Sequence, residues 1–294
     1  MDFLGKAETF VRIVESGSFS AAGRSLGLSL AAISRQVAAL EAELDAKLLL
    51  RTTRSLHLTD EGRRFHEHAT RLLREADAAR SSVRPGGAIA GQLVVSASVT
   101  LGMLRIVPAL PQLFTAHPAL DLALRLEDRS SELVSEGVDV AVRAGMALPD
   151  TTSLVAHRLA TFQRVLVATP AYLKRRGSPR SVAALSEHEA VLGLDSSGLW
   201  EFVEAGVARS VTVRARLRVG TLLAVRTAVL AGMGVSILPD FVVAEALQAR
   251  TLKALLTEAE LAPVSAEALY RVESRGLPRI EALLRHLRAS LPLA

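Results

Sequence analysis

The sequence contains no cysteine, which excludes a disulfide framework and a thiolate metal site. It has no run of about 18 apolar residues without a charge, so we expect no membrane span. The first residues, from Met1 to Lys6, lack the basic start and the apolar stretch of a signal peptide. These absences indicate a cytoplasmic protein, and nothing in the sequence requires a metal or a cofactor.

What is present fits a globular protein of more than one domain. The chain has 294 residues, more than a single domain usually holds, and half of them are hydrophobic, which is enough for sizeable cores. The formal net charge of +5 is compatible with a polyanionic partner such as nucleic acid, although it is too small to establish one.

The N-terminal residues carry three helix patterns with matching start and stop signals. Apolar residues at helical spacing predict a first helix that ends at Gly17, a residue suited to a left-handed helix end. Ser18 is expected to cap a second helix over residues 19–26, which Gly27 ends. Ser29 is expected to cap a third helix, whose apolar face is Ile33, Val37, Leu40 and Leu44.

The opposite face of the third helix is free of negative charge. No acidic residue occurs from Ser16 to Leu40, and none occurs from Ala46 to Thr59. Residues 48–58 alternate in the manner of a short hairpin, with Arg51 and Arg54 near its tip. Because a second helix presented across a short turn is a standard means of entering the DNA major groove, this region predicts a DNA-binding domain over residues 1–59.

Residues 60–86 are expected to form a long linker helix, capped by Thr59 and ended at Arg84-Pro85-Gly86-Gly87. Heptad-like spacing along it predicts a seam for a partner helix, which would make it a dimerisation helix. The alternative is an amphipathic helix that packs on its own domain. The residues of the seam are Phe65, Ala69, Leu72, Ala76, Ala79 and Val83.

From Gln92 onwards, strand-like and helix-like segments alternate, which predicts an α/β architecture with largely parallel sheets. Two helical patterns stand out, over residues 100–117 and 222–231. The expected strands are residues 93–97, 121–126, 138–142, 164–168, 211–219 and 235–238.

Ordered motifs extend over most of the chain. The first set runs through Phe10-Val11, Val14 to Ala22, Leu26-Gly27, Ile33 to Val37, Leu40-Glu41, Leu48 to Arg54, and Leu58-Thr59 with Gly62. The second set runs through Gly137 to Arg143, Thr169 to Leu173, Trp200, Ala231 to Val235, and Leu238-Pro239. In this order and spacing the sequence resembles the LysR-type transcriptional regulators.

That resemblance implies a winged helix-turn-helix, a linker helix, and a periplasmic-binding-protein-like effector domain over residues 91–294. The effector domain would consist of two α/β subdomains, one of residues 91–161 with 268–294 and one of residues 162–267. The resemblance also implies promoter DNA, a small-molecule effector and further copies of the chain, as a homodimer or homotetramer, as partners. RNA polymerase is a further partner that it suggests.

The DNA-contacting residues follow from the same resemblance. The family usually has Gln after the capping Ser and then Ser or Pro, whereas this chain has Leu30 and Ala31, which can only pack on thymine methyl groups. We therefore expect Ser34 and Arg35 to supply most polar base contacts and DNA shape to contribute to the preference. The full expected set is Arg24, Ser29, Leu30, Ala31, Ser34, Arg35, Arg51 and Arg54. For Arg24, an ion pair with a neighbouring helix is an equal alternative.

Effector contacts are expected after the first strand of the effector domain and before the helix at residue 222. Both places are strand-to-helix turns, where free amides attract anions, so we expect an effector that carries a carboxylate. For the hydroxyl residues, simple helix capping is an equal alternative. The expected contacts are Ser98, Thr100, Leu101, Leu194, Gly220 and Thr221, with Asp195 nearby.

Three other functions fit the sequence less well. An enzyme is disfavoured because the chain has no Gly-x-Ser-x-Gly elbow, no P-loop and no His-Glu-x-x-His motif, and His66 and His68 point to different faces of a helix. A periplasmic solute receptor would have a signal peptide and would not have the N-terminal 90 residues. A DNA-binding architectural protein without an effector would not need an α/β region of this size.

Overall fold

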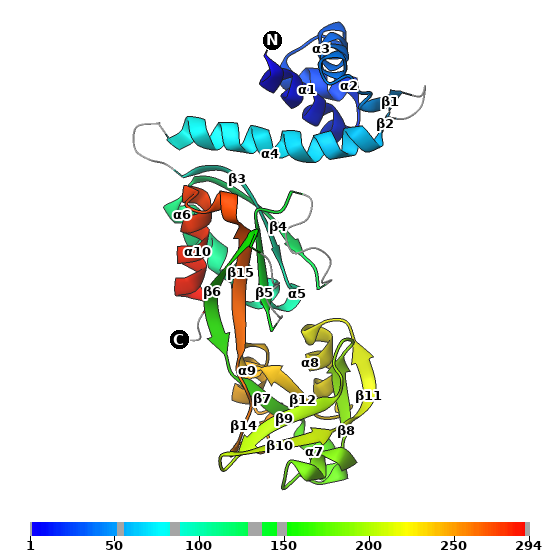
Figure 1. The fold of residues 1–294 in the computed structure, drawn as a ribbon. Coiled ribbons are helices and arrows are strands. Elements are labelled where there is room, and N and C mark those ends of the chain that lie inside the picture. Colours follow the sequence, from blue (N-terminus) through cyan, green and yellow to red (C-terminus); the bar gives the residue numbers. More distant parts are fainter. Residues whose placement is uncertain (1, 52–55, 83–88, 129–136, 146–151, 292–294) are drawn as a thin grey trace. The chain divides into compact units, whose positions relative to one another are not determined.

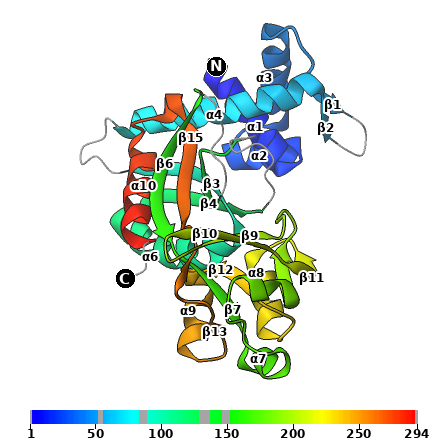
Figure 2. The ribbon, with the colours of Figure 1, turned by 60° about the horizontal axis from the view of Figure 1, so that its bottom comes forward.

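The computed structural model describes residues 2–51, 56–82, 89–128, 137–145 and 152–291. Its internal contacts separate two compact units, with the main division between Gln92 and Leu93. We call residues 2–82 the N-terminal domain and residues 89–291 the C-terminal domain. Figures 1 and 2 show the elements of each.

The N-terminal domain is a small helical domain with a two-stranded wing. Strands β1 and β2 pair antiparallel, with Leu49 opposite Leu58 and Arg51 opposite Leu56. The elements are α1 (Phe3–Ser16), α2 (Phe19–Leu26), α3 (Leu30–Glu43), β1 (Leu49–Arg51), β2 (Leu56–Leu58) and α4 (Asp60–Ser82). The expected helix-turn-helix and wing are confirmed, as is the second helix at residues 19–26.

Local signals set the helix boundaries of this domain. Gly17 ends α1 with φ of 67°, a left-handed conformation that glycine adopts without strain. The hydroxyls of Ser18 and Ser29 each accept a hydrogen bond from the backbone N–H three residues on, at 3.1 and 3.2 Å. Thr59 caps α4 in the same way, with the N–H of Gly62 donating to its hydroxyl at 2.8 Å. All three caps were predicted from the sequence.

The long helix α4 packs on α1 of the same domain through its first half. Phe65 lies edge-on to Phe3 and Phe10, with ring centroids 6.2 and 5.4 Å apart, and Ala69 is buried in the domain core. The core itself is formed by the apolar faces of the three shorter helices with Leu48 and Leu49 of the wing. The start of the predicted dimer seam is therefore covered within its own chain.

The first part of the C-terminal domain is a five-stranded sheet in the order β4-β3-β5-β15-β6. Helices α6 and α10 pack on each other beside it, and the His286 ring nitrogen lies 2.7 Å from the Ala109 carbonyl oxygen (Figure 1). The strands are β3 (Ala90–Ala97), β4 (Ala119–Leu126), β5 (Val140–Ala144), β6 (Leu154–Phe162) and β15 (Val264–Arg271). The helices are α5 (Val99–Leu101), the π-helical turn η1 (Gly102–Ile106), α6 (Val107–Ala116), the 3₁₀ turn η3 (Val272–Ser274) and α10 (Pro278–Ser290).

The second part consists of three small sheets with the orders β10-β9-β14, β11-β8 and β12-β7-β13. Its core includes Tyr172, Trp200 and Phe202. The strands are β7 (Arg164–Ala168), β8 (Glu189–Gly193), β9 (Leu199–Glu204), β10 (Val207–Thr212), β11 (Arg214–Val219), β12 (Ser236–Pro239), β13 (Lys253–Ala254) and β14 (Ala259–Glu260). The helices are α7 (Pro170–Arg176), η2 (Ala183–Glu187), α8 (Leu222–Leu230) and α9 (Asp240–Gln248).

The α/β architecture is confirmed, but the expectation of largely parallel sheets is wrong. Among the described residues, β3 pairs in parallel with β5 and β8 with β11, whereas β15 runs antiparallel to both β5 and β6, and β7 runs antiparallel to β12 and β13. The expected strand over residues 211–219 is also wrong, because it is two strands that belong to different sheets. Each of these depends on pairing between distant residues, which a local pattern does not specify.

The chain passes between the two parts of the C-terminal domain twice. β6 leads into β7 at Gln163, and β15 begins at Val264, so the expected border at residues 267 and 268 falls inside β15.

One helical stretch of the described residues, Val99–Ala116, is long and apolar enough to cross a membrane by length and composition. Core helices of water-soluble proteins meet the same criterion, and this stretch buries Leu101, Ile106 and Leu113 within the domain.

Candidate DNA-reading surface and effector loops

The predicted DNA-reading residues of α2 and α3 lie on exposed surface. Arg24, Ser29, Ala31 and Arg35 are exposed, and Leu30 is 54% exposed, which is unusual for so large an apolar side chain. Ser34 is half-buried beside Ile33, whose side chain enters the core. The first turns of α3 therefore present an apolar tip followed by one arginine, as the sequence predicted.

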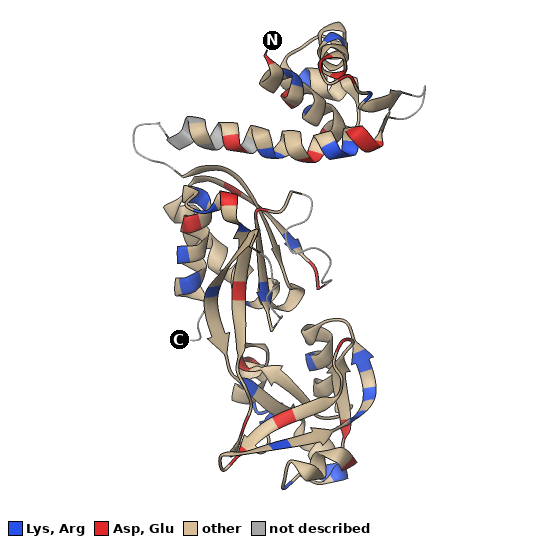
Figure 3. Ribbon diagram, in the orientation of Figure 1, with Lys and Arg blue, Asp and Glu red and all other residues tan. Residues whose placement is uncertain are grey.

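Two basic residues of this surface, Arg24 and Arg35, lie in the described part of the chain. In the part of the chain that the structure describes, Arg24 and Arg35 have no ion-pair partner. The equal alternative for Arg24, pairing with a neighbouring helix, finds no support there. Figure 3 shows no acidic position on α2 or the first turns of α3. Arg51 lies in β1, and Arg54 lies outside the described residues.

Glu41 joins the end of α3 to the wing, a role that the sequence motif did not reveal. Its carboxylate accepts hydrogen bonds from the N–H groups of Leu48 and Leu49, at 2.9 and 3.2 Å, and pairs with Lys47 at 2.8 Å. Burial alone would raise the pKa of Glu41, but the hydrogen bonds from Lys47, Leu48 and Leu49 outweigh it and lower the pKa below 4.5. The carboxylate therefore fixes the wing relative to α3.

The expected effector residues occupy two loops of the C-terminal domain. Ser98 to Leu101 follow β3 and form the short helix α5 with its cap; Thr100 and Leu101 are buried, while Ser98 makes no side-chain capping bond. Thr221 begins α8, and its hydroxyl accepts a hydrogen bond from the N–H of Ala224 at 3.1 Å, so its capping role is real. Leu194 is 62% exposed, and a side-chain carbon added at Gly220 would lie 3.6 Å from it.

The structure brings these two loops together through Thr100. Thr100 is 3% exposed, and its hydroxyl accepts a hydrogen bond of 3.3 Å from the N–H of Leu223 in the first turn of α8. The residues are 123 positions apart in the sequence, so no local pattern could have paired them. The hydroxyl of Thr100 thus belongs to both strand-to-helix turns at once.

Charged groups lie beside this junction. Arg143 is buried and donates to the Ser96 hydroxyl at 2.6 Å, and Ser96 in turn donates to Glu127 at 2.9 Å. Burial lowers the pKa of Arg143, and the nearby Glu127 and Asp128 carboxylates oppose that shift. Asp128 accepts a hydrogen bond from the N–H of Val99 at 2.9 Å, so the start of α5 already holds one carboxylate.

The rest of the predicted dimer seam is more open than its beginning. Leu72 is 43% exposed, Ala76 is half-buried and Ala79 is exposed, while Val83 lies outside the described residues. Among the described residues, no group of three or more His, Cys, Asp or Glu is arranged to hold a metal ion.

Models of two protein families match the chain and together cover nearly all of it. The model described as the bacterial regulatory helix-turn-helix protein, lysR family, matches residues 4–63. The model described as the LysR substrate binding domain matches residues 86–292.

Individual proteins agree with the family models. The chain is 36% identical to the transcriptional regulator PtxR of Pseudomonas aeruginosa over 96% of this chain and 91% of that protein. It is 34% identical to the probable transcriptional regulator LtrA of Klebsiella pneumoniae over 88% of this chain and 84% of that protein. The solved structure of CrgA, a LysR-type transcriptional regulator from Neisseria meningitidis, superposes with a TM-score of 0.61 at 29% identity and covers 97% of each chain.

Proposed function

Since the chain belongs to the family of LysR-type transcriptional regulators, we propose that α3 reads its promoter site while a small carboxylate, bound where Thr100 meets α8, controls that binding. The family consists of regulators rather than enzymes, and they bind promoter DNA and small-molecule effectors and form oligomers. The observation that carries the effector half is the hydrogen bond from Leu223 to Thr100, which joins the two candidate loops.

Backbone amides at this junction support a carboxylate as the effector's polar group. In the described part of the chain, the N–H groups of Thr100 and Leu101 have no hydrogen-bond partner. Free amides at a helix start attract anions, and Asp128 already holds the neighbouring N–H of Val99 in this way. An effector carboxylate of similar size would satisfy the remaining two.

The effector proposal is tested by thermal-shift screening of small carboxylates against the full chain and Thr100→Val. A ligand that contacts Thr100 should stabilise the wild type clearly more than the variant, because valine keeps the shape and removes the hydroxyl. Thr227→Val is the matched control, since among the described residues that hydroxyl donates only to the Leu223 carbonyl of its own helix. Equal stabilisation of all three proteins would remove Thr100 from the site.

The DNA half of the proposal assigns base contacts to Arg35 and Ser34 and apolar contacts to Leu30 and Ala31. Arg35 is exposed and has no internal ion pair among the described residues, and no acidic residue precedes it in α2 or α3. Arg51, at the end of β1, and Arg54, which lies outside the described residues, are proposed to contact phosphates or the minor groove. The site preference then depends partly on DNA shape, because Leu30 cannot form the paired hydrogen bonds that a glutamine would.

Arg35→Ala should weaken operator binding by about 1–3 kcal/mol and relax the preference at one base position. The operator is first selected with the wild-type chain from the DNA upstream of its own gene. The measurement is the binding of each protein to a library of variants of that operator. Arg12→Ala is the control, because Arg12 is an exposed arginine of the same domain that pairs with Glu15. Unchanged affinity and unchanged preference in Arg35→Ala would show that another residue reads the site.

Three further assignments follow from family membership and remain proposals. We propose that Leu72, Ala76 and Ala79 form the exposed part of a dimer contact with a second copy, in a homodimer or homotetramer. RNA polymerase is the proposed partner at the promoter. The proposed location is the cytoplasm, where promoter DNA is found in bacteria.

A further inference from the structure

An open pocket of about 380 Å³ lies between β6 and α10. Its lining comes from one residue of the strand, His157, and from one face of the helix: Glu281, Leu284, Arg285, Arg288 and Ala289. None of these residues belongs to the two effector loops or to the DNA-reading surface. The volume is at the small end of the range for ligand sites, which is about 300–1,000 Å³.

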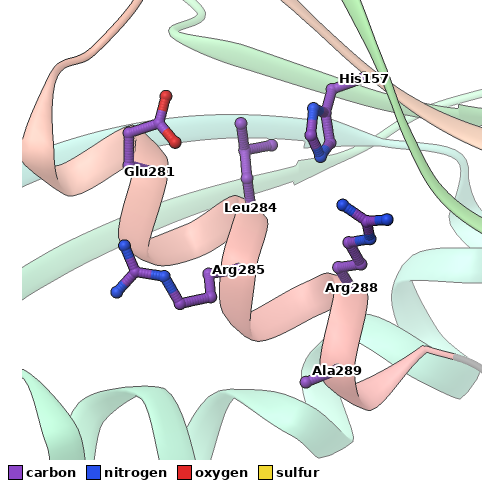
Figure 4. Close-up of a pocket in the computed structure, with 6 residues that line it drawn as sticks. All are labelled: His157, Glu281, Leu284, Arg285, Arg288 and Ala289. Atoms are coloured by element: carbon purple, nitrogen blue, oxygen red, sulfur yellow. The ribbon is translucent and has the colours of Figure 1, made fainter.

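The charges of the pocket lie on two sides of an apolar floor. Leu284, 2% exposed, forms the floor, and Figure 4 shows the Arg288 guanidinium and the His157 ring on one side of it. The Glu281 carboxylate and the Arg285 guanidinium lie on the other side, so Arg285 points away from His157 (Figure 4). Within the described residues, the side chains of His157 and Arg288 have no hydrogen bond and no ion pair. Two donors therefore face the same end of the pocket without an acceptor.

We propose that this pocket is a second ligand site, which takes a small monocarboxylate with an apolar body. The carboxylate would accept hydrogen bonds from Arg288 and His157, which are charge-assisted and therefore among the stronger polar contacts. The apolar body would lie on Leu284 and end near Glu281. Because Glu281 places a negative charge at that end, a dicarboxylate of the same length is repelled.

Hexanoate and adipate are suitable probes, because both have six carbons and only adipate carries a second carboxylate. We expect hexanoate to bind the full-length wild-type chain at least about tenfold more tightly than adipate, measured by calorimetric titration. Arg288→Gln should weaken hexanoate binding at least about tenfold, and His157→Gln severalfold. Arg275→Gln is the control, since Arg275 is an exposed arginine near the start of the same helix that does not line the pocket.

Two further variants separate this pocket from the proposed effector site. Glu281→Gln should raise adipate binding close to that of hexanoate, a gain that a misfolded variant would not show. Thr100→Val should leave hexanoate binding unchanged, because Thr100 is part of the other site. The inference is overturned if wild type binds no hexanoate, if Arg288→Gln and His157→Gln both bind it as wild type does, or if Glu281→Gln leaves adipate binding unchanged.

Discussion

The two domains of this regulator differ in how far apart in the sequence their stabilising partners lie. In the N-terminal domain, Ser18, Ser29 and Thr59 each cap a helix through an N–H three residues on. In the C-terminal domain, Arg158 pairs with Glu267, 109 residues away, and Leu223 bonds to Thr100, 123 residues away. A DNA-reading head built from local signals is thus joined to a ligand-responsive part built from distant pairings.

The comparison predicts that a backbone clash in one domain should leave the other folded. A side-chain carbon at Gly62 would lie 2.0 Å from the Leu48 carbonyl oxygen, and one at Gly234 would lie 2.3 Å from that of Glu189. Because both obstacles are backbone, each glycine-to-alanine change should destabilise its own domain by about 3 kcal/mol or more. Hydrogen exchange should report the loss of stability in the N-terminal domain. Emission of Trp200, the single tryptophan of the chain, should report the loss of stability in the C-terminal domain.

Gly17→Ala is the control for these two variants, because the glycine has φ of 67° but nothing lies within 4 Å of the added carbon. It should cost only about 1 kcal/mol, from backbone conformation alone. If Gly62→Ala also lowers the denaturation midpoint seen by Trp200, the two domains unfold as one unit and the comparison fails.

The same difference explains what the sequence predicted. Helix α2, the caps and the wing follow from side chains that act within a few residues of themselves, so residues 19–26 were correct to the residue. The merged strand at 211–219 was wrong because Val213, whose N–H donates to the Gly198 carbonyl at 2.9 Å, separates β10 from β11. Its partner is fifteen positions back in the sequence, beyond any alternation pattern.

The candidate sites divide in the same way. The exposure of Leu30 and Arg35 was predictable, because one helical face of α3 is apolar and the other carries them. The hydrogen bond between Thr100 and Leu223, and the pocket between β6 and α10, both join segments that are far apart in the sequence. Neither His157 nor Arg288 belongs to a sequence motif. The pairing of distant segments places them in one pocket.

Glu41 gives the next largest expected effect, and it is confined to the N-terminal domain. Its pKa is below the unfolded value of 4.5, so the stability that it contributes is present above pH 4.5 and is lost as the pH falls through the lower, folded pKa. Glu41→Gln should cost about 1–2 kcal/mol near pH 7, because the N–H groups of Leu48 and Leu49 lose a charged acceptor. It should also flatten the acid response, measured by hydrogen exchange of residues 2–51.

Lys47→Gln is the matched control for Glu41. The Lys47 side chain is 77% exposed, so removing this ion pair alone should change stability by less than about 1 kcal/mol. If both variants lose the same stability, Glu41 stabilises the domain through its ion pair with Lys47 rather than through its hydrogen bonds to the backbone.

The smallest expected effects are changes in how the free energy of unfolding depends on pH near neutrality, one in each domain. Burial is the main cause that lowers the pKa of His188 below 6.5, with Arg176 adding to the shift and Glu187 opposing it. The unfolded chain then binds the proton more readily than the folded one. His188 therefore favours folding fully above pH 6.5, and this contribution is lost as the pH falls from 6.5 to the folded pKa.

His66 of α4 shows the same direction in the N-terminal domain, because burial lowers its pKa while Glu15 and Glu67 oppose the shift. His188→Gln should flatten the dependence of C-terminal stability on pH below 6.5, measured by Trp200 emission. It should leave the hydrogen exchange of residues 2–51 unchanged. His66→Gln should do the reverse. Because each histidine titrates inside one domain, a variant that changed both slopes would reveal coupling between the DNA-reading head and the ligand-binding part, which local contacts alone do not provide.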